Sequence, residues 1–448
     1  MPTNGSWRSC CRCWSPPVRS PMWASSTVSP STGSPTHEKA DMRRPTAPLV
    51  RCALVLGLLL TAVGCGDAEK SRVTIMVPWT RTEFAAFHSL IDAFEESHPT
   101  IDVQPQVTRD LTPQLDAAVA AGAAPDLAVL PSVGALTKFR NDRSLQPIAI
   151  DTKAFVQPFR GLAMHGDVVY AVPVKADVKS LVWYDPEVIV PPPPKTWAAL
   201  ASRPESWCLG LASGPTSGWP GADWIADILL AGEGVDAYKA WASGTREWGS
   251  VAEAWSTWRD LIDKNEKELA QASGLSFTEA TEDMKDNTCS LSHGALSAQD
   301  FEADQVRTYT YVKPLKGQPL EVSADFVVKF TDDDSAEKFV RYLATAQAQQ
   351  AWADAPGFAL SAHKDVTRYE NATQGQVAAM LRSGHTLCFS AADAMDPDVS
   401  AAFYRAVLEY VKGAELKGLL EALDRVRQRL GTDDSPPSTP LCGTPNQP

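Results

Sequence analysis

An alternation of strand-like and helix-like segments between residues 73 and 130 constrains the fold of this chain most. The apolar run 73–77 is followed by a helical pattern that ends near Pro99, and the order repeats through 101–104, 111–121 and 126–130. Apolar side chains in the helical segments recur every three to four residues, which is the period of an amphipathic helix. Strands that alternate with helices indicate an α/β fold with a parallel sheet, in which functional loops follow the carboxyl ends of the strands.

Later segments add strands and helices to this framework. Strands are expected at residues 168–174, 180–184 and 326–330, and residues 175–179 are interpreted as the connection between the first two. Helices are expected at residues 336–352, 399–411 and 416–430, and residues 432–448 are interpreted as a disordered tail. Thr80 and Glu83 have the spacing of a capping box at the start of the first helix. Tryptophans in the central helical region are predicted to lie in the core: Trp224, Trp241, Trp248, Trp255 and Trp258.

The length and charge of the chain limit its organisation and its partners. Its 448 residues are too many for one ordinary hydrophobic core, so two domains or lobes are expected. The first 64 residues carry seven of the 41 basic and two of the 54 acidic residues, which leaves a formal charge of −18 on the remainder. Such a charge argues against nucleic acid or anionic lipid as a partner.

Residues 42–64 have the three parts of a secretory signal peptide. Basic residues precede the apolar run 53–60, and small residues follow it up to Cys65. The apolar run is too short to span a membrane as a helix. Residues 1–41 are rich in Ser, Pro, Arg and Trp and show no helical or strand period, so we interpret them as a non-native extension.

Four cysteines follow Cys65 in the exported part of the chain, at positions 208, 289, 388 and 442. In an exported protein this number suggests up to two disulfide bonds. Cys208 follows a tryptophan at the start of a strand, and Cys289 begins another alternating stretch, so we expect these two to pair. Whether Cys388 and Cys442 pair stays open, because Cys442 lies in a proline-rich tail.

The segment 217–224 places two tryptophans and an acid among glycines and a proline, the residues that interrupt regular structure most strongly. Aromatic faces cover the C–H faces of a sugar ring, and carboxylates accept hydrogen bonds from hydroxyl groups. The segment is therefore a candidate sugar-binding loop that presents Trp219 and Asp223. The alternative is that both indoles anchor the core where a loop enters a helix.

Catalytic motifs are missing from the sequence. It contains no nucleophile elbow, no His-Glu-x-x-His, no phosphate-binding loop and no His/Cys metal cluster, so we expect neither a metal nor a cofactor. Asp223 and Asp227 lie four residues apart on a predicted helix, whereas glycosidase carboxylates flank the scissile bond from opposite sides. We therefore expect a protein that is not an enzyme. A secreted glycosidase and a ligand-binding sensor remain the alternatives.

Ordered segments over nearly the whole chain after residue 72 resemble the extracellular solute-binding proteins of carbohydrate ABC transporters, of the α-glucoside type. The matching segments are 73–99, 125–127, 170–174, 181–184, 193–197, 207–210, 217–224 and 357–358. The most specific are Pro-Pro-Lys-Thr-Trp at 193–197 and Ser-Gly-Trp-Pro-Gly-Ala-Asp-Trp at 217–224. Residues 389–395 depart from the pattern of this branch, since Ser390 and Ala392 replace a carboxylate and a hydroxyl, while Asp393 is kept. Residues 62–65 resemble a bacterial lipobox with Ala62 at the usual leucine position.

The resemblance implies a periplasmic-binding-protein type II-like fold, with two α/β lobes and a ligand cleft between them. Lobe 1 would hold residues 73–178 with 310–360, and lobe 2 residues 179–309 with 361–431. Cys65 would be acylated and residues 65–72 would form a lipid-anchored tether, so the protein would face the periplasm or the cell exterior. It would bind a carbohydrate as a monomer and deliver it to ABC permease subunits in the membrane.

Nine residues are candidates for ligand binding, on the turn after the first strand, before the crossing strand, in the 217–224 loop and in three later segments. They are Trp79, Thr80, Arg81, Asp177, Trp219, Asp223, His293, Phe358 and Asp393. The aromatic residues would stack on the sugar and the polar ones would bond its hydroxyls. Each has a structural alternative, such as a solvated charge for Arg81, a surface acid for Asp177 and a structural histidine for His293.

Overall fold

The computed structural model describes residues 70–264, 266–299, 301, 308–431 and 440–446. The predicted signal peptide, the predicted lipidation site at Cys65 and the first 41 residues lie outside this part of the chain, so the expectations about them stay predictions. None of the described helices is both long enough and apolar enough to cross a bilayer.

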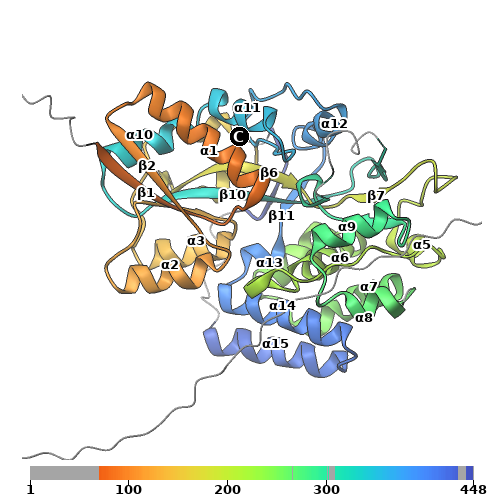
Figure 1. The fold of residues 1–448 in the computed structure, drawn as a ribbon. Helices are drawn as coiled ribbons and strands as arrows, with labels where there is room; N and C mark the ends of the chain where they lie inside the picture. Colours follow the sequence, from red (N-terminus) through yellow and green to blue (C-terminus); the bar gives the residue numbers. More distant parts are fainter. Residues whose placement is uncertain (1–69, 265, 300, 302–307, 432–439, 447–448) are drawn as a thin grey trace, which may run out of the picture. The chain divides into compact units, whose positions relative to one another are not determined.

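The predicted alternation of strands and helices forms one edge of a sheet. Its elements are β1 (Ser71–Val77), α1 (Arg81–Ser97), β2 (Ile101–Val107), α2 (Leu111–Ala120) and β3 (Leu127–Leu130). β1 pairs in parallel with both β2 and β3, which confirms the α/β prediction. All four residues of β3 are buried, as expected for a parallel strand covered by helices on both faces. Figure 1 shows α1 on one side of these strands and α2 on the other.

Four strands from distant parts of the chain complete this seven-stranded sheet. They are β6 (Ala171–Val178), β10 (Leu320–Lys329), β11 (Leu387–Phe389) and β12 (Cys442–Gly443), and the order is β12-β11-β10-β3-β1-β2, with β6 also paired to β10. β10 runs antiparallel to β3 and β6 and parallel to β11. We call the part of the protein around this sheet the first lobe.

The prediction that residues 175–179 only connect two strands was wrong, because residues 175–178 are part of β6. Asp177 lies opposite Ser323 in the register with β10, and all eight residues of β6 are buried. Charged side chains at alternate positions broke the apolar pattern of this strand in the sequence. Their burial is explained below by ion pairs rather than by exposure to solvent.

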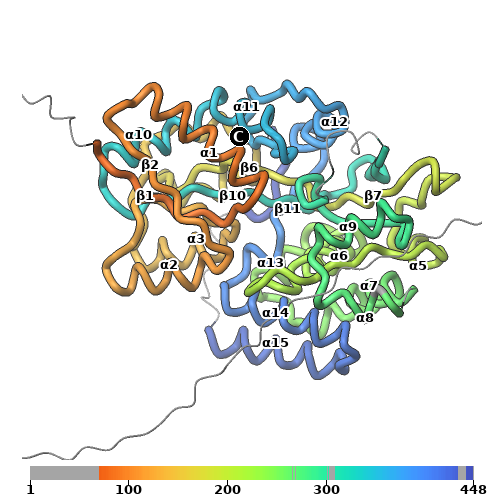
Figure 2. The backbone as a smooth tube through the Cα atoms, viewed as in Figure 1, coloured from red at the N-terminus to blue at the C-terminus, as the bar shows by residue number. Residues whose placement is uncertain are grey.

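A smaller sheet and a group of helices form the second lobe. The sheet consists of β7 (Val182–Tyr184), β8 (Leu291–His293) and β9 (Thr310–Tyr311), with β7 in the middle. The main helices are α6 (Trp219–Ala242), α7 (Ala252–Ile262), α14 (Pro397–Val411) and α15 (Leu416–Leu430). The five tryptophans predicted to be core residues are all at most 3% exposed in this lobe, which confirms that prediction. Figure 2 follows the chain between the lobes, from β6 to β7, from β9 to β10 and from β11 into the blue helices.

Short elements connect these parts. The helices are α3 (Val133–Asn141), α4 (Phe159–Leu162), α5 (Trp197–Ala201), α8 (Glu266–Gln271), α9 (Phe277–Lys285), α10 (Asp334–Leu343), α11 (Ala346–Asp354), α12 (Ala372–Met380) and α13 (Ala391–Ala394). The short strands are β4 (Met164–His165) and β5 (Val168–Val169), and the 3₁₀ turns are η1 (Thr152–Ala154), η2 (Gly214–Thr216), η3 (Trp248–Val251) and η4 (Leu296–Gln299). The single helix expected at 336–352 is divided into α10 and α11, because the Thr345 hydroxyl accepts a hydrogen bond from the Ala348 amide and starts a new helix.

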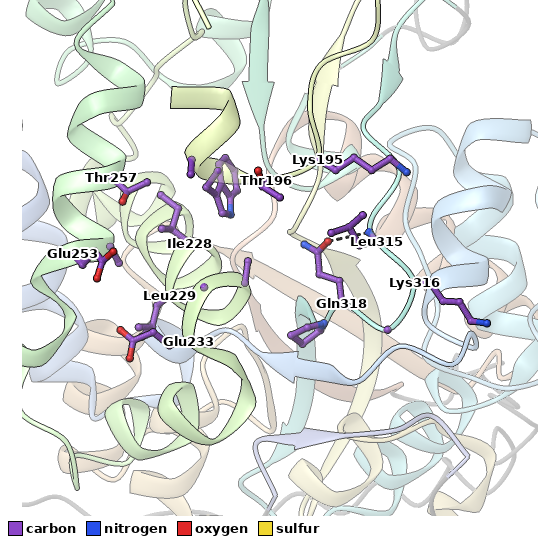
Figure 3. A pocket seen from close by; sticks show the side chains of 17 residues that line it. Lys195, Thr196, Ile228, Leu229, Glu233, Glu253, Thr257, Leu315, Lys316 and Gln318 are labelled. Carbon is purple, nitrogen blue, oxygen red and sulfur yellow. Dashed lines mark hydrogen bonds between the residues drawn. The ribbon is translucent and has the colours of Figure 1, made fainter. Parts of the chain in front are cut away.

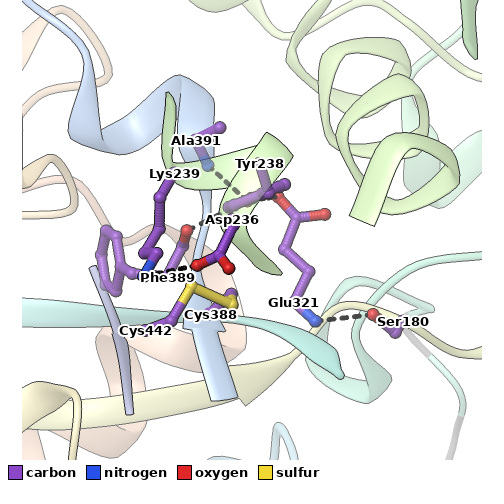
Figure 4. Close-up of a disulfide and its surroundings, with 9 residues drawn as sticks. All are labelled: Ser180, Asp236, Tyr238, Lys239, Glu321, Cys388, Phe389, Ala391 and Cys442. Atoms are coloured by element: carbon purple, nitrogen blue, oxygen red, sulfur yellow. Dashed lines mark hydrogen bonds and ion pairs between the residues drawn. A yellow bond between two sulfur atoms is a disulfide. The ribbon is translucent and has the colours of Figure 1, made fainter. Parts of the chain in front are cut away.

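Two disulfide bonds join distant segments. Cys208 and Cys289 are bonded, as predicted, and Cys388 is bonded to Cys442. The second bond and the antiparallel pairing of β12 with β11 hold residues 442–443 on the sheet. The prediction of a disordered tail was therefore wrong for this part of it (Figure 4).

The apolar side chains form two buried clusters that differ in part from the predicted lobe boundaries. One cluster surrounds the seven-stranded sheet, extends to Trp183 and Tyr311 of the smaller sheet, and includes Val377 and Ala378 of α12. The sequence-based boundary at residue 361 had assigned this helix to the second lobe. The other cluster contains the tryptophans of α6 and α7 together with side chains of α14 and α15.

Candidate functional site

Three charged residues lie on the same face of β6 and its extension, because side chains alternate along a strand. They are Lys175, Asp177 and Lys179, and each is at most 9% exposed. Buried charges are rarely found without partners, since removing them from water is costly. Their partners come from both lobes.

Lys175 joins β6 to the first turn of α1. Its Nζ lies 2.7 Å from Glu83 Oε1 and 3.3 Å from Asp177 Oδ2. Burial disfavours the ammonium ion, but Asp177, Glu83 and Asp325 outweigh burial and raise the pKa of Lys175. Asp177 in turn accepts a 2.7 Å hydrogen bond from the Ser297 hydroxyl of η4, between β8 and β9. This group therefore connects the two lobes.

Lys179 joins the crossing segment to α6 and α13. Its Nζ lies 2.7 Å from Asp223 Oδ2 and 3.0 Å from Asp393 Oδ2. Burial has the largest effect on the pKa of Asp223 and raises it. The charge of Lys179 lowers the pKa and that of Asp393 raises it, and the resulting pKa is about 6. We call the six residues Glu83, Lys175, Asp177, Lys179, Asp223 and Asp393 the interlobe cluster.

Trp219 borders this cluster at the start of α6. Its side chain is partly exposed, and Lys179 Nζ lies 5.6 Å from the ring centroid, within the range of a cation–π contact. The ring of Phe277 meets it edge-on at 5.3 Å. Gly218, with φ +104°, allows this placement, since a Cβ atom there would lie 2.1 Å from the carbonyl oxygen of Tyr404.

The loop after β3 brings the first lobe against the second. The Ser132 hydroxyl donates to the carbonyl oxygen of Asp393 at 2.9 Å. A Cβ atom on Gly134 would lie 1.7 Å from the carbonyl oxygen of Met395, so the start of α3 and α13 approach each other at backbone distance. The interlobe cluster thus lies where the loops after β1 and β3 meet α6 and α13.

The structure brings Asp177, Trp219, Asp223 and Asp393 together among the predicted site residues. Trp79 lies instead in the core of the first lobe, where it is 3% exposed. Its ring packs against Phe87 and Trp352, and its indole nitrogen donates to Asp325 at 2.8 Å. In this conformation Trp79 offers no free face to a ligand.

The predicted capping box at the start of α1 is absent. Thr80 occupies the N-cap position but its side chain makes no capping bond. Arg81 has φ +51° and is exposed, and Arg109 Nη2 lies 3.4 Å from the Thr80 hydroxyl. Phe358 is partly buried with φ +55°, and Gly357 before it lies against Thr82. Thr80, Arg81 and Phe358 therefore border the junction without belonging to the cluster.

His293 serves a neighbouring buried network. Its Nε2 lies 3.1 Å from Asp227 Oδ2, and its ring stacks on Trp224 at 5.1 Å. Asp227 also accepts a 2.6 Å hydrogen bond from the Ser180 hydroxyl. Asp223 and Asp227 therefore have separate partners and do not face one another across a groove, as a glycosidase pair would. Within the described ranges no group of three or more His, Cys, Asp or Glu residues is arranged to hold a metal ion.

Sequence reasoning missed Lys175, Lys179, Glu83 and Ser297. The two lysines had a detectable signal, because they alternate with Asp177 inside an otherwise apolar stretch of strand length. Such a pattern is compatible with a strand that buries one charged face, and it is equally compatible with a loop. Glu83 and Ser297 are polar residues on helical segments, and their positions depend on tertiary contacts.

A second buried network links all three crossings between the lobes. The Tyr238 hydroxyl accepts from the Ala391 amide at 2.7 Å and lies 3.2 Å from Glu321 Oε1 and 3.0 Å from the Phe389 carbonyl (Figure 4). The Glu321 amide donates to the Ser180 hydroxyl at 2.7 Å. Burial, followed by the charge of nearby Asp223, raises the pKa of Glu321 well above its usual range. This network lies on the segments that connect the two lobes.

An open cavity lies elsewhere on the second lobe. It has a volume of about 550 Å³ and is bordered by α5, α6, α7 and the loop before β10 (Figure 3). Trp197, Glu233 and Lys316 line it, but none of the nine predicted site residues does. We base the candidate site on the interlobe cluster rather than on this cavity, because the cluster combines buried charges, an aromatic face and residues from both lobes.

Comparison with known proteins identifies the family. Residues 89–379 match the family model described as bacterial extracellular solute-binding protein. The osmoprotective compounds-binding protein GgtB of Synechocystis sp. is 27% identical over 80% of this chain and 93% of its own length. The α-glucosides-binding periplasmic protein AglE of Rhizobium meliloti is 25% identical over 78% of this chain and 85% of its own length.

Solved structures share the fold. The bacterial solute receptor AcbH, described as having an exclusive preference for β-D-galactopyranose, aligns with a TM-score of 0.69 at 16% identity over 81% of this chain and 99% of its own. The GacH receptor of Streptomyces glaucescens, studied without ligand and with acarbose, aligns with a TM-score of 0.60 at 14% identity over 81% and 99%. Together, the two-lobed α/β architecture and the family match over most of the described residues show that this chain belongs to the bacterial extracellular solute-binding proteins.

Proposed function

We propose that this protein is the substrate-binding component of an ABC importer and that it captures a sugar, of the α-glucoside type, between its lobes. The observation that carries the proposal is the interlobe cluster beside the partly exposed ring of Trp219. Carboxylate and ammonium groups make the stronger hydrogen bonds to hydroxyl groups, and an indole face covers the apolar face of a pyranose. The relative named for α-glucosides supports a sugar, and the relative named for osmoprotective compounds supports a small-molecule ligand.

Ligand entry requires the lobes to separate. Lys175, Asp177, Lys179 and Asp223 are at most 9% exposed in this conformation, and their ion pairs use each other as partners. A sugar would replace some of these bonds by hydroxyl contacts to both lobes. A ligand that contacts both lobes stabilises the closed state relative to the open one, which is the condition for a ligand-driven closure.

The export signal and the cysteine that follows it complete the proposal. Acylation of Cys65 would hold the binding protein at the membrane, facing the periplasm or the cell exterior. The predicted tether 65–72 would then be shortened to residues 65–70, because β1 begins at Ser71. Two acyl chains give stable anchoring where one gives only reversible binding. From there the protein, acting as a monomer, would present its ligand to membrane permease subunits.

A thermal-shift screen of residues 66–448 tests this proposal. The panel holds mono- and oligosaccharides with different linkages and small uncharged osmolytes, and ligand at about 100 times its Kd should stabilise the folded protein by about 2.7 kcal/mol. A sugar that raises the unfolding temperature and is recovered unchanged supports the proposal. Release of a product on prolonged incubation would instead indicate a glycosidase. No stabilisation by any member of the panel would contradict sugar binding.

A further inference from the structure

The interlobe cluster and its nearest neighbours contain more acidic than basic groups. Lys175 is shared by Glu83 and Asp177, and Asp325 is close enough to raise its pKa as well. Lys179 is shared by Asp223 and Asp393, and Glu321 acts on it in the same way. Six carboxyl groups therefore surround two ammonium groups on one face of the crossing strand.

The interlobe cluster and its neighbours keep an excess of negative charge when the protonation of the carboxyl groups is considered. Burial, followed by the charge of nearby Asp223, raises the pKa of Glu321, so this carboxyl is best counted as uncharged. Burial raises the pKa of Asp325 to about 6, against the lowering effect of Lys175, and Asp223 has a similar value, so both are mostly ionised above pH 7. Five carboxylates then face two ammonium groups.

Other charged or titratable groups nearby do not reverse this sign. Arg81 is exposed, and its charge lowers the pKa of Glu279 on α9, after the hydrogen bonds that Glu279 accepts from Ser276. Arg109 is directed to the hydroxyl of Thr80. The phenol of Tyr404 lies 3.4 Å from Asp393 Oδ1, and burial, with Asp393 next, raises its pKa, so it stays uncharged. The positive end of α1 already has Glu83 in its first turn.

We infer that the site selects against anionic sugars, so that its ligand is a glycoside without phosphate or carboxylate groups, either uncharged or bearing a basic nitrogen. This inference rests on the proposed function. Hydroxyl and ammonium groups donate hydrogen bonds to the surplus carboxylate oxygens. A phosphate or uronate would instead bring like charge into a poorly solvated site, where charge interactions are several times stronger than in water.

The experiment compares three ligands with one ring structure. The uncharged sugar that stabilises the protein most in the screen is measured by calorimetry beside its 6-phosphate and its 6-O-methyl ether at pH 7.5. The ether tests the added bulk without charge. The phosphate should bind at least about 100-fold more weakly than the ether, and the difference should shrink as salt is raised. A phosphate that binds within tenfold of the ether would overturn the inference while leaving sugar binding intact, and absence of any sugar binding would refute the proposed function instead.

A pair of variants tests whether the buried carboxyls cause the discrimination. Asp325→Asn removes one negative charge next to Lys175 and keeps an oxygen that can accept from Trp79. Asp236→Asn removes a charge from a side chain that is 97% exposed on α6. The ratio of the phosphate Kd to the ether Kd should fall at least threefold in D325N and stay the same in D236N. Equal ratios in the two variants would overturn the electrostatic origin, and the salt dependence of the wild type remains decisive if D325N fails to fold.

Discussion

Trp219 and Trp224 lie five residues apart and have opposite environments. Trp224 is 3% exposed and packs on Trp207 and His293, whereas Trp219 is partly exposed beside Lys179. The sequence predicted this division, because a glycine and a proline interrupt the backbone near Trp219, while Trp224 already has helical spacing to later apolar residues. The lysine beside the ring could not be predicted, since it comes from the segment between β6 and β7, forty residues earlier.

Replacement of Trp219 by alanine tests its role in binding. We expect Trp219→Ala to weaken sugar binding at least tenfold and to remove the ligand-dependent change in tryptophan fluorescence, because an aromatic contact contributes about 0.5–1.5 kcal/mol beyond the area it buries. Fluorescence titration measures both, and circular dichroism should show a folded protein. Trp197→Ala is the control, since Trp197 is also partly exposed but lines the separate cavity. Unchanged affinity in Trp219→Ala would remove this residue from the site.

The raised pKa of Asp325 leads us to predict that the stability of the protein depends on pH. Burial raises its pKa to about 6 from 3.8, so between these values the folded protein binds more protons than the unfolded chain, and stability falls as pH rises. The loss is at most on the order of 3 kcal/mol, complete above pH 6, and smaller where solvent reaches the carboxyl. Asp325→Asn should reduce the slope of the urea-unfolding free energy between pH 4 and 6.5, and Asp223, whose pKa is also raised to about 6, should keep part of it. A slope equal to that of the wild type would show that Asp325 does not contribute to this titration.

At the level of elements, the first turn of α6 depends on one glycine. Gly218 has φ +104° and lies against the Tyr404 backbone, so Gly218→Ala should strain the turn and displace Trp219, with a loss of about 2 kcal/mol or more in stability and weaker binding. Gly232 on the same helix has nothing within 4 Å of its added Cβ. Gly232→Ala should therefore stabilise α6 by up to about 1 kcal/mol. Urea unfolding of both variants checks the contrast, and a similar cost in both would contradict this account of Gly218.

The second disulfide attaches the last strand to the sheet. Cys388 and Cys442 enclose 54 residues in sequence, so loss of the bond in a Cys388→Ser, Cys442→Ser double variant should cost about 4 kcal/mol on the chain-entropy model. The loss would be measured as a lower unfolding free energy in urea. Limited proteolysis should then cleave within residues 440–446 in the variant and not in the oxidised protein. Equal resistance of both forms would show that the pairing of β12 with β11 suffices without the bond.

Elements that depend on local pattern were predictable, and those that depend on distant partners were not. The periodicity between residues 73 and 130 predicted β1 to β3 and their helices, because each segment carries its own apolar face. β12 has only two residues, and its order comes from a disulfide and one neighbouring strand. β6 was missed in part because buried Lys175 has a carboxylate partner on α1, and Lys179 just after the strand has its partners on α6 and α13.

At the scale of the whole molecule, polar and backbone contacts link the two lobes beside an apolar cluster that extends from the seven-stranded sheet to Trp183 and Tyr311 of the smaller sheet. Two hydrogen bonds cross the junction, from the Ser297 hydroxyl to Asp177 and from the Ser132 hydroxyl to the carbonyl oxygen of Asp393. The Tyr238 hydroxyl accepts a hydrogen bond from the backbone of a crossing segment. The family resemblance predicted two lobes from sequence, but not these contacts, since they join segments more than 100 residues apart. In the proposed change between open and closed states, these contacts would break and form again.

The close approach of α3 to α13 offers a test of that change without any ligand. A Cβ atom on Gly134 would lie 1.7 Å from the Met395 carbonyl oxygen, a distance that only a shift of the backbone can relieve. We expect Gly134→Ala to push the lobes apart, so that the radius of gyration from small-angle X-ray scattering increases and sugar affinity falls, because the closed state is less populated. Gly249→Ala, with open space around its Cβ, is the control and should change neither quantity. If Gly134→Ala keeps both the wild-type radius and the wild-type affinity, the contact between α3 and α13 does not govern closure, and separation of the lobes would have to be sought at the Lys175 and Lys179 ion pairs instead.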